Sequence, residues 1–95
     1  MTLWDFKYKN NVKRIWYAAR INMSDTKRLS ANHWNAYCFA NKKERDNWVD
    51  TNMKDPDFFA VKTDWWHVRR IIGFSSESYC VAVVGNHNQL SCVEL

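Results

Sequence analysis

Apolar and polar residues alternate at the start of the chain. Trp4, Phe6 and Tyr8 are separated by single charged residues. A period of two is typical of a half-buried strand, so we expect a strand here. Residues 10–11 are both asparagine, which tolerates positive φ and therefore indicates a turn. Residues 12–21 alternate again, which predicts a second strand and a hairpin between the two.

The strongest local signal is a junction between a strand and a helix. Residues 34–40 are aromatic and uncharged, which predicts a third strand, antiparallel to the second. Asn41 then stands at an N-cap position and Glu44 follows three residues later, the spacing of a capping box. A helix is therefore expected over residues 42–52, with Trp48 on its apolar side.

The second half of the chain predicts one short strand, a second helix and a hairpin. Residues 58–62 favour a brief edge strand. A helix is expected over residues 64–72, because apolar residues recur there at i, i+3 and i+7. Residues 79–84 are rich in β-branched side chains and predict a strand, and residues 90–95 predict the strand that closes the sheet.

Together these elements predict an α+β domain with an antiparallel sheet of four to five strands and two helices packed on one face. The 95 residues are expected to form a single domain, residues 1–95. We expect Trp48, Val49, Val68 and Ile72 to face the sheet.

Composition and charge bear on function. The chain has six Trp, five Phe and four Tyr. These are more aromatic rings than a small core hides, so some are expected at the surface. Of the net charge of +4, residues 1–50 contribute ten Lys/Arg against five Asp/Glu, and residues 51–95 contribute four against five. The basic half favours an acidic partner, either a protein face or a nucleic acid, with ordinary solubility charge as the alternative.

Catalytic and metal chemistry find little support in the sequence. The soft metal ligands His33, His67, His87 and the three cysteines lack the spacing of a zinc site. Cys38 lies in an apolar stretch, which raises the pKa of a thiol and makes it a poor nucleophile. We therefore expect no enzyme activity, no metal and no cofactor.

Residues 37–49, YCFANKKERDNWV, carry a resemblance to a known group of proteins. They resemble small bacteriophage proteins in which a strand ends in a helix start of the type F-x-(S/T/N)-K-x-E-R-D-x-W-V. The segment AVKTD at residues 60–64 is similar to the same pattern, and the resemblance covers about a third of the chain. It implies a small α+β accessory protein of the anti-CRISPR or anti-defence kind. Such proteins bind and inhibit host or defence machinery. No functional residue carries over, because the motif is scaffold.

Location is expected to be the cytoplasm of the host cell. Asp5 and Lys7 interrupt the apolar start that a signal peptide needs. No apolar run approaches the roughly 20 residues of a membrane span, so no membrane partner is expected.

We therefore predict a non-catalytic protein-binding module, a phage inhibitor of a host or defence protein. Aromatic anchors with nearby cations are typical of binding hot spots, which singles out Trp4, Tyr8, Arg14, Trp16, Arg28 and Trp66. The alternative is a small basic nucleic-acid-binding protein, with phosphate contacts from Lys7, Lys9, Lys13, Arg14, Lys27 and Arg28. The target, the binding face and the oligomeric state stay open at this point.

Overall fold

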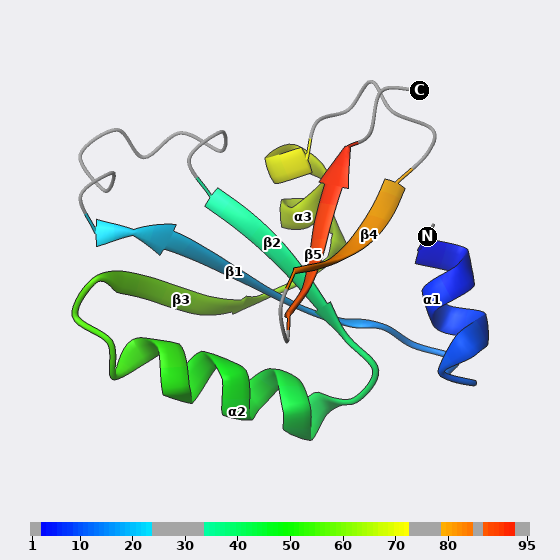
Figure 1. Ribbon diagram of the computed structural model, residues 1–95, viewed down its shortest axis with the longest axis horizontal. Helices are drawn as coiled ribbons and strands as arrows, with labels where there is room; N and C mark the ends of the chain where they lie inside the picture. Colours follow the sequence, from blue (N-terminus) through cyan, green and yellow to red (C-terminus); the bar gives the residue numbers. More distant parts are fainter. Residues whose placement is uncertain (1–2, 24–33, 73–78, 85–86, 93–95) are drawn as a thin grey trace.

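The computed structural model describes residues 3–23, 34–72, 79–84 and 87–92 (Figure 1). In chain order, the helices and strands are α1 (Leu3–Lys9), β1 (Trp16–Asn22), β2 (Trp34–Phe39), α2 (Lys42–Met53), β3 (Phe58–Thr63), α3 (Trp65–Ile72), β4 (Tyr79–Val84) and β5 (His87–Cys92). No helix within these ranges has the length and apolar character needed to cross a bilayer.

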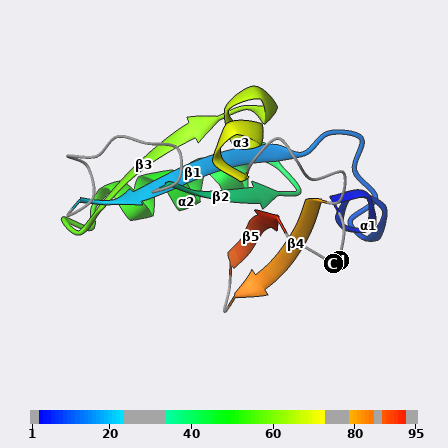
Figure 2. The same ribbon diagram turned by 90° about the horizontal axis from the view of Figure 1, so that it is seen from above.

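The five described strands form one sheet in the order β3-β1-β2-β5-β4, and each neighbouring pair is antiparallel. The ladder between β1 and β2 is continuous from Trp16↔Phe39 to Ile21↔Trp34. The ladder between β2 and β5 is short, with two paired positions. Figure 2 shows that β4 and β5 run in a different direction from the other strands. The predicted α+β class with an antiparallel sheet is confirmed.

The two predicted helices form, but they cover opposite faces of the sheet, which corrects the expectation that both pack on one face. Successive residues of a strand point to opposite faces of the sheet, and β1 and β2 carry apolar side chains on both faces. Each face therefore needs a helix to cover it. The cluster under α2 contains Ala18, Tyr37, Phe39, Val49 and Ala60, with Trp16 and Trp48 packed against it. The cluster under α3 contains Phe6, Ala36, Cys38, Val68 and Leu90, with Ile15, Tyr17, Trp65 and Ile72 among the side chains around it.

The first element is a helix, so the predicted strand over Trp4 to Tyr8 and its hairpin are wrong. Leu3 and Phe6 lie one turn apart and both belong to the α3 side of the core, where Phe6 is buried. Burying this pair needs a helical period, and that packing outweighs the alternating pattern of the same residues.

The asparagine pair ends this helix instead of turning a hairpin. Asn11 has a φ of 51°, the left-handed conformation that asparagine tolerates. Its amide donates to the carbonyl of Tyr8 at 3.1 Å, and the amide of Val12 donates to the carbonyl of Lys7 at 3.2 Å. These two bonds form a Schellman motif, which satisfies carbonyls at the helix end. The asparagine pair therefore predicted the positive φ correctly, but the element that precedes it is a helix and not a strand.

Both later helices begin where the sequence predicts. Asn41 accepts a hydrogen bond from the amide of Glu44 at 2.8 Å, as an N-cap does. Asp64 accepts one from the amide of His67 at 3.2 Å. The strand-to-helix junctions of β2–α2 and β3–α3 are thus fixed by local hydrogen bonds.

The outer edge of β3 is covered by α2 and the turn after it. The amide of Ala60 donates to Sδ of Met53 at 3.3 Å. The amide of Phe58 donates to the carbonyl of Asp55 at 3.2 Å. Further along the strand, Nζ of Lys62 lies 3.5 Å from Oδ1 of Asp46. Two amides of the edge strand therefore have partners outside the sheet.

Candidate partner-binding surface

Two adjacent tryptophans at the start of α3 have different environments. Trp65 packs on the core side, with its ring centroid 5.8 Å from that of Tyr17. Trp66 is 68% exposed. Neighbouring positions on a helix point about 100° apart, so only one of the two can join the core. Val68 is fully buried and anchors the inner side of the helix, which fixes the direction in which Trp66 projects.

A hollow of about 340 Å³ lies beside Trp66. It forms where the start of β1, the end of β3, the start of α3 and one side chain of α2 meet. Aromatic and basic side chains dominate its lining, which consists of Arg14, Ile15, Trp16, Tyr17, Arg45, Thr63, Asp64, Trp65 and Trp66. We call it the tryptophan hollow. It brings together three predicted contact residues, Arg14, Trp16 and Trp66.

Arg45 supports one side of the tryptophan hollow from within. It is buried, its Nη1 donates to the carbonyl of Tyr17 at 3.2 Å, and its Nε donates to Oδ1 of Asp46 at 2.8 Å. The hydrogen bond from Arg45 is the main reason that the pKa of Asp46 lies below its ordinary value, with Lys62 adding to the effect. The guanidinium carbon lies 5.1 Å from the ring centroid of Trp16. The charge of Arg45 is therefore compensated, and the residue positions Trp16.

Arg14 supplies the exposed charge at the hollow. Its guanidinium carbon lies 4.1 Å from the ring centroid of Trp16. No carboxylate pairs with it within the described part of the chain. A stacked guanidinium keeps its hydrogen-bond donors at the edge of the stack, where they remain available to a carboxylate. The hollow thus combines an aromatic floor with a cation at its rim.

Asp64 brings an acidic side chain to the lining, the one acid among its described residues. Its Oδ1 lies 2.8 Å from Nδ1 of His67. Hydrogen bonds from the side chain and amide of His67 hold the pKa of Asp64 below its ordinary value. The carboxylate is therefore occupied as the cap of α3 and by its histidine neighbour.

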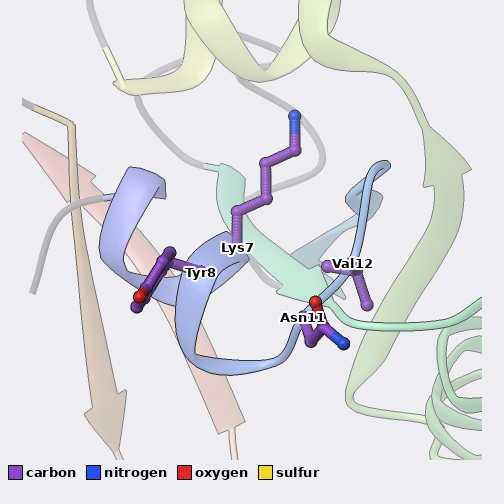
Figure 3. A pocket seen from close by; sticks show the side chains of 4 residues that line it. All are labelled: Lys7, Tyr8, Asn11 and Val12. Atoms are coloured by element: carbon purple, nitrogen blue, oxygen red, sulfur yellow. The ribbon is translucent and has the colours of Figure 1, made fainter.

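The other predicted contact residues lie elsewhere. Tyr8 is 90% exposed on α1, beside a separate hollow of about 470 Å³ lined by Lys7, Tyr8, Asn11 and Val12. Figure 3 shows Lys7 and Tyr8 leaving α1 on different sides. The structure does not describe the side chain of Trp4.

The predicted cations fall into two groups. Lys9, the last residue of α1, and Lys13, between α1 and β1, are exposed. Lys27 and Arg28 lie outside the described residues.

Sequence reasoning missed Arg45, Trp65 and Arg69 as parts of this surface. The guanidinium carbon of Arg69 lies 5.1 Å from the ring centroid of Trp66. For Arg45 a signal was present, because it lies one turn before Val49 and so on the buried side of α2. A cation on that side must find partners inside the fold.

The thiol of Cys38 lies inside the fold, on β2. Cys38 is fully buried, and burial raises its pKa from the ordinary 9.0 to about 12, as its apolar strand predicts. The pKa of neighbouring Tyr17 rises from 10.0 to about 12, first through burial and then through the charge of Cys38. Among the described residues, no three His, Cys, Asp or Glu side chains lie together as metal ligands would.

Stability is expected to fall in alkali because of Cys38. The folded thiol stays protonated until about pH 12, whereas the unfolded thiol ionises near 9.0. The raised pKa of Cys38 therefore contributes its full share of the unfolding free energy below about pH 9, and this share is lost as the pH rises toward 12. Urea midpoints measured across this range should fall less steeply for Cys38→Ala than for the natural chain. Parallel curves for the two proteins would contradict the assignment.

Comparison of the chain with models of known protein families, with curated proteins and with solved structures finds no match.

Proposed function

We propose that the chain is a non-catalytic protein-binding module that holds its partner at the tryptophan hollow. The observation that carries the proposal is Trp66, a large apolar side chain that is 68% exposed and is held on a short helix by buried Val68. An exposed aromatic anchor beside a preformed hollow loses little conformational freedom when it binds.

The composition of the surface matches that of a binding hot spot. Trp, Tyr and Arg are the residues that most often dominate interface energies. Trp66 would enter a cleft of the partner, and a partner side chain would fill the tryptophan hollow between Trp16 and Trp65. A carboxylate of the partner would pair with Arg14 as water leaves the contact. The net charge of +4 favours approach to an acidic face.

We further propose that the module is a phage inhibitor of host or defence machinery, as the resemblance at residues 37–49 implies. These residues span the end of β2, the N-cap of α2 and its first two turns, and Tyr37, Cys38, Phe39, Arg45 and Val49 among them are buried. That placement is consistent with their role as scaffold. Arg45 is the one among them that reaches the tryptophan hollow.

Nucleic-acid binding is the second candidate, and a cluster of cations favours it. Lys9, Lys13 and Arg14 are exposed in the segment from the end of α1 to β1, and Lys7 precedes them. A run of this kind can follow a phosphate backbone. Binding of this type would weaken steeply as salt is added, with a log–log slope of about −0.7 to −0.9 per neutralised phosphate.

Replacing Trp66 by alanine is expected to weaken the partner complex about tenfold, because the change removes the anchor. The matched control is Tyr8→Ala, which removes an even more exposed aromatic from α1, away from the hollow. A partner is first captured from a host-cell lysate with and without nuclease, and the purified complex is then titrated by calorimetry.

The outcomes separate the two candidates. A protein that is captured after nuclease treatment and loses affinity with Trp66→Ala but not with Tyr8→Ala supports the proposal. Equal affinity of all three chains would refute the tryptophan hollow as the site. Recovery of nucleic acid alone, with strong salt dependence, would favour the second candidate.

A further inference from the structure

A second hollow borders α3 and differs in chemistry from the first. Its volume is about 310 Å³, and it lies between α3, β1 and β3. Among the described residues, Thr63 alone lines both hollows. Small-molecule sites occupy roughly 300–1,000 Å³, so this hollow has room for a small ligand. We call it the aliphatic hollow.

The floor of the aliphatic hollow is apolar and comes from three elements. Ala19 and Val61 are paired across the β1–β3 ladder, and Ile71 faces them from α3. Ala19 is almost fully buried, and its methyl group leaves space that a larger residue would fill. Trp34 closes one side, with its ring centroid 6.1 Å from that of Phe59 in an edge-to-face arrangement.

One cation at the rim, Arg70, has no ion-pair partner among the described carboxylates. Arg70 is exposed in the last turn of α3, and no described carboxylate lies within ion-pair distance of it. His67 also lines the hollow, and its Nδ1 is engaged by Asp64 at 2.8 Å, which leaves Nε2 as its second polar atom. An apolar floor with an unpaired guanidinium at the rim complements a molecule that has an apolar body and one negative end.

We propose that the aliphatic hollow binds a small carboxylate with an apolar chain, of the medium-chain fatty-acid class. The chain lies over Ala19, Val61 and Ile71, and the carboxylate pairs with Arg70 at the rim. This site is separate from the tryptophan hollow, and the proposal does not depend on the protein-binding function.

The test is a titration with octanoate, followed by NMR shifts of the backbone amides of β1, β3 and α3. Saturable binding is expected at these amides. Each buried methylene adds roughly a factor of four in affinity, so hexanoate, which is two methylenes shorter, should bind about sixteenfold more weakly and acetate should not bind. Octylammonium, which has the same number of carbons and the opposite charge, should not bind.

The variant Arg70→Gln should bind octanoate about tenfold more weakly, because a charge-assisted hydrogen bond is lost. The matched control is Lys42→Gln, which removes one positive charge from exposed α2 on the other face and should bind as the natural chain does. Equal binding of octylammonium, unchanged binding by Arg70→Gln, or shifts confined to the tryptophan hollow would each overturn the proposal. Failure here leaves the partner test of Trp66→Ala unaffected, since no protein partner is present in the titration.

Discussion

Replacing Trp48 by alanine is expected to lower the free energy of unfolding by about 3 kcal/mol, the lower end of the range for such truncations. The ring of Trp48 covers the α2 side of the sheet, with its centroid 4.6 Å from that of Tyr37 and 5.6 Å from that of Phe39. It is partly buried, which places the loss at the lower end. Small domains are stable by about 5–15 kcal/mol, so the change removes a large share of the total.

The measurement is urea denaturation followed by circular dichroism. The matched control is Trp66→Ala, the same substitution at an exposed position, which should change the unfolding free energy by less than about 0.5 kcal/mol. Equal losses for the two variants would show that Trp48 does not hold α2 against the sheet.

Replacing Arg20 by methionine is expected to cost about 2–3 kcal/mol, although no described carboxylate pairs with this arginine. Nη1 of Arg20 donates to Oδ1 of Asn52 at 2.8 Å, and Nη2 donates to the hydroxyl of Tyr37 at 3.0 Å. Its guanidinium carbon also lies 4.1 Å from the ring centroid of Phe58. Methionine keeps much of the apolar contact but leaves the acceptor of buried Asn52 without this donor.

Salt distinguishes this network from a surface ion pair. The loss on Arg20→Met should be similar at low and high salt, because hydrogen bonds and ring stacking are screened weakly. Arg14→Met is the matched control, since Arg14 stacks on a ring but is exposed and makes no hydrogen bond to the described part of the fold. It should change stability by less than about 0.5 kcal/mol. A loss for Arg20→Met that disappears in high salt would contradict the structural account.

Elements fixed by local chemistry were predictable from the sequence, and those fixed by distant packing were not. The start of α2 follows from Asn41 and Glu44, which are three residues apart. For α3 the sequence offered Thr63 or Asp64 as the cap, and the structure has Asp64 in that place. The first helix depends on Phe6 entering a cluster with residues as distant as Leu90. No local pattern near residues 3–9 reports that contact.

The same limit applied to the placement of the helices. Ala18 and Ala19 are neighbours in β1, so they point to opposite faces of the sheet, and both are buried. Two adjacent alanines do not show in the sequence which face a helix covers. The sequence therefore supported a one-sided arrangement as well as the two-sided one that forms.

The sequence indicated the types of residue that form the candidate surface, but only some of their positions. Aromatic residues beside cations pointed to Arg14, Trp16 and Trp66, which the fold gathers at one hollow. Tyr8 met the same criteria and lies elsewhere. The aliphatic hollow depends on the register of Ala19 with Val61, a pairing set by the whole β1–β3 ladder.

The covered edge of β3 bears on how the protein behaves when it is abundant. An open edge strand offers free amides to a second chain, which is the usual start of aggregation into fibrils. Here the Ala60 amide is held by Met53 and the Phe58 amide by Asp55, so an incoming strand must first displace both. On this side of the sheet, the chain therefore has a barrier to fibril growth even though it displays Trp66 and Tyr8 to solvent.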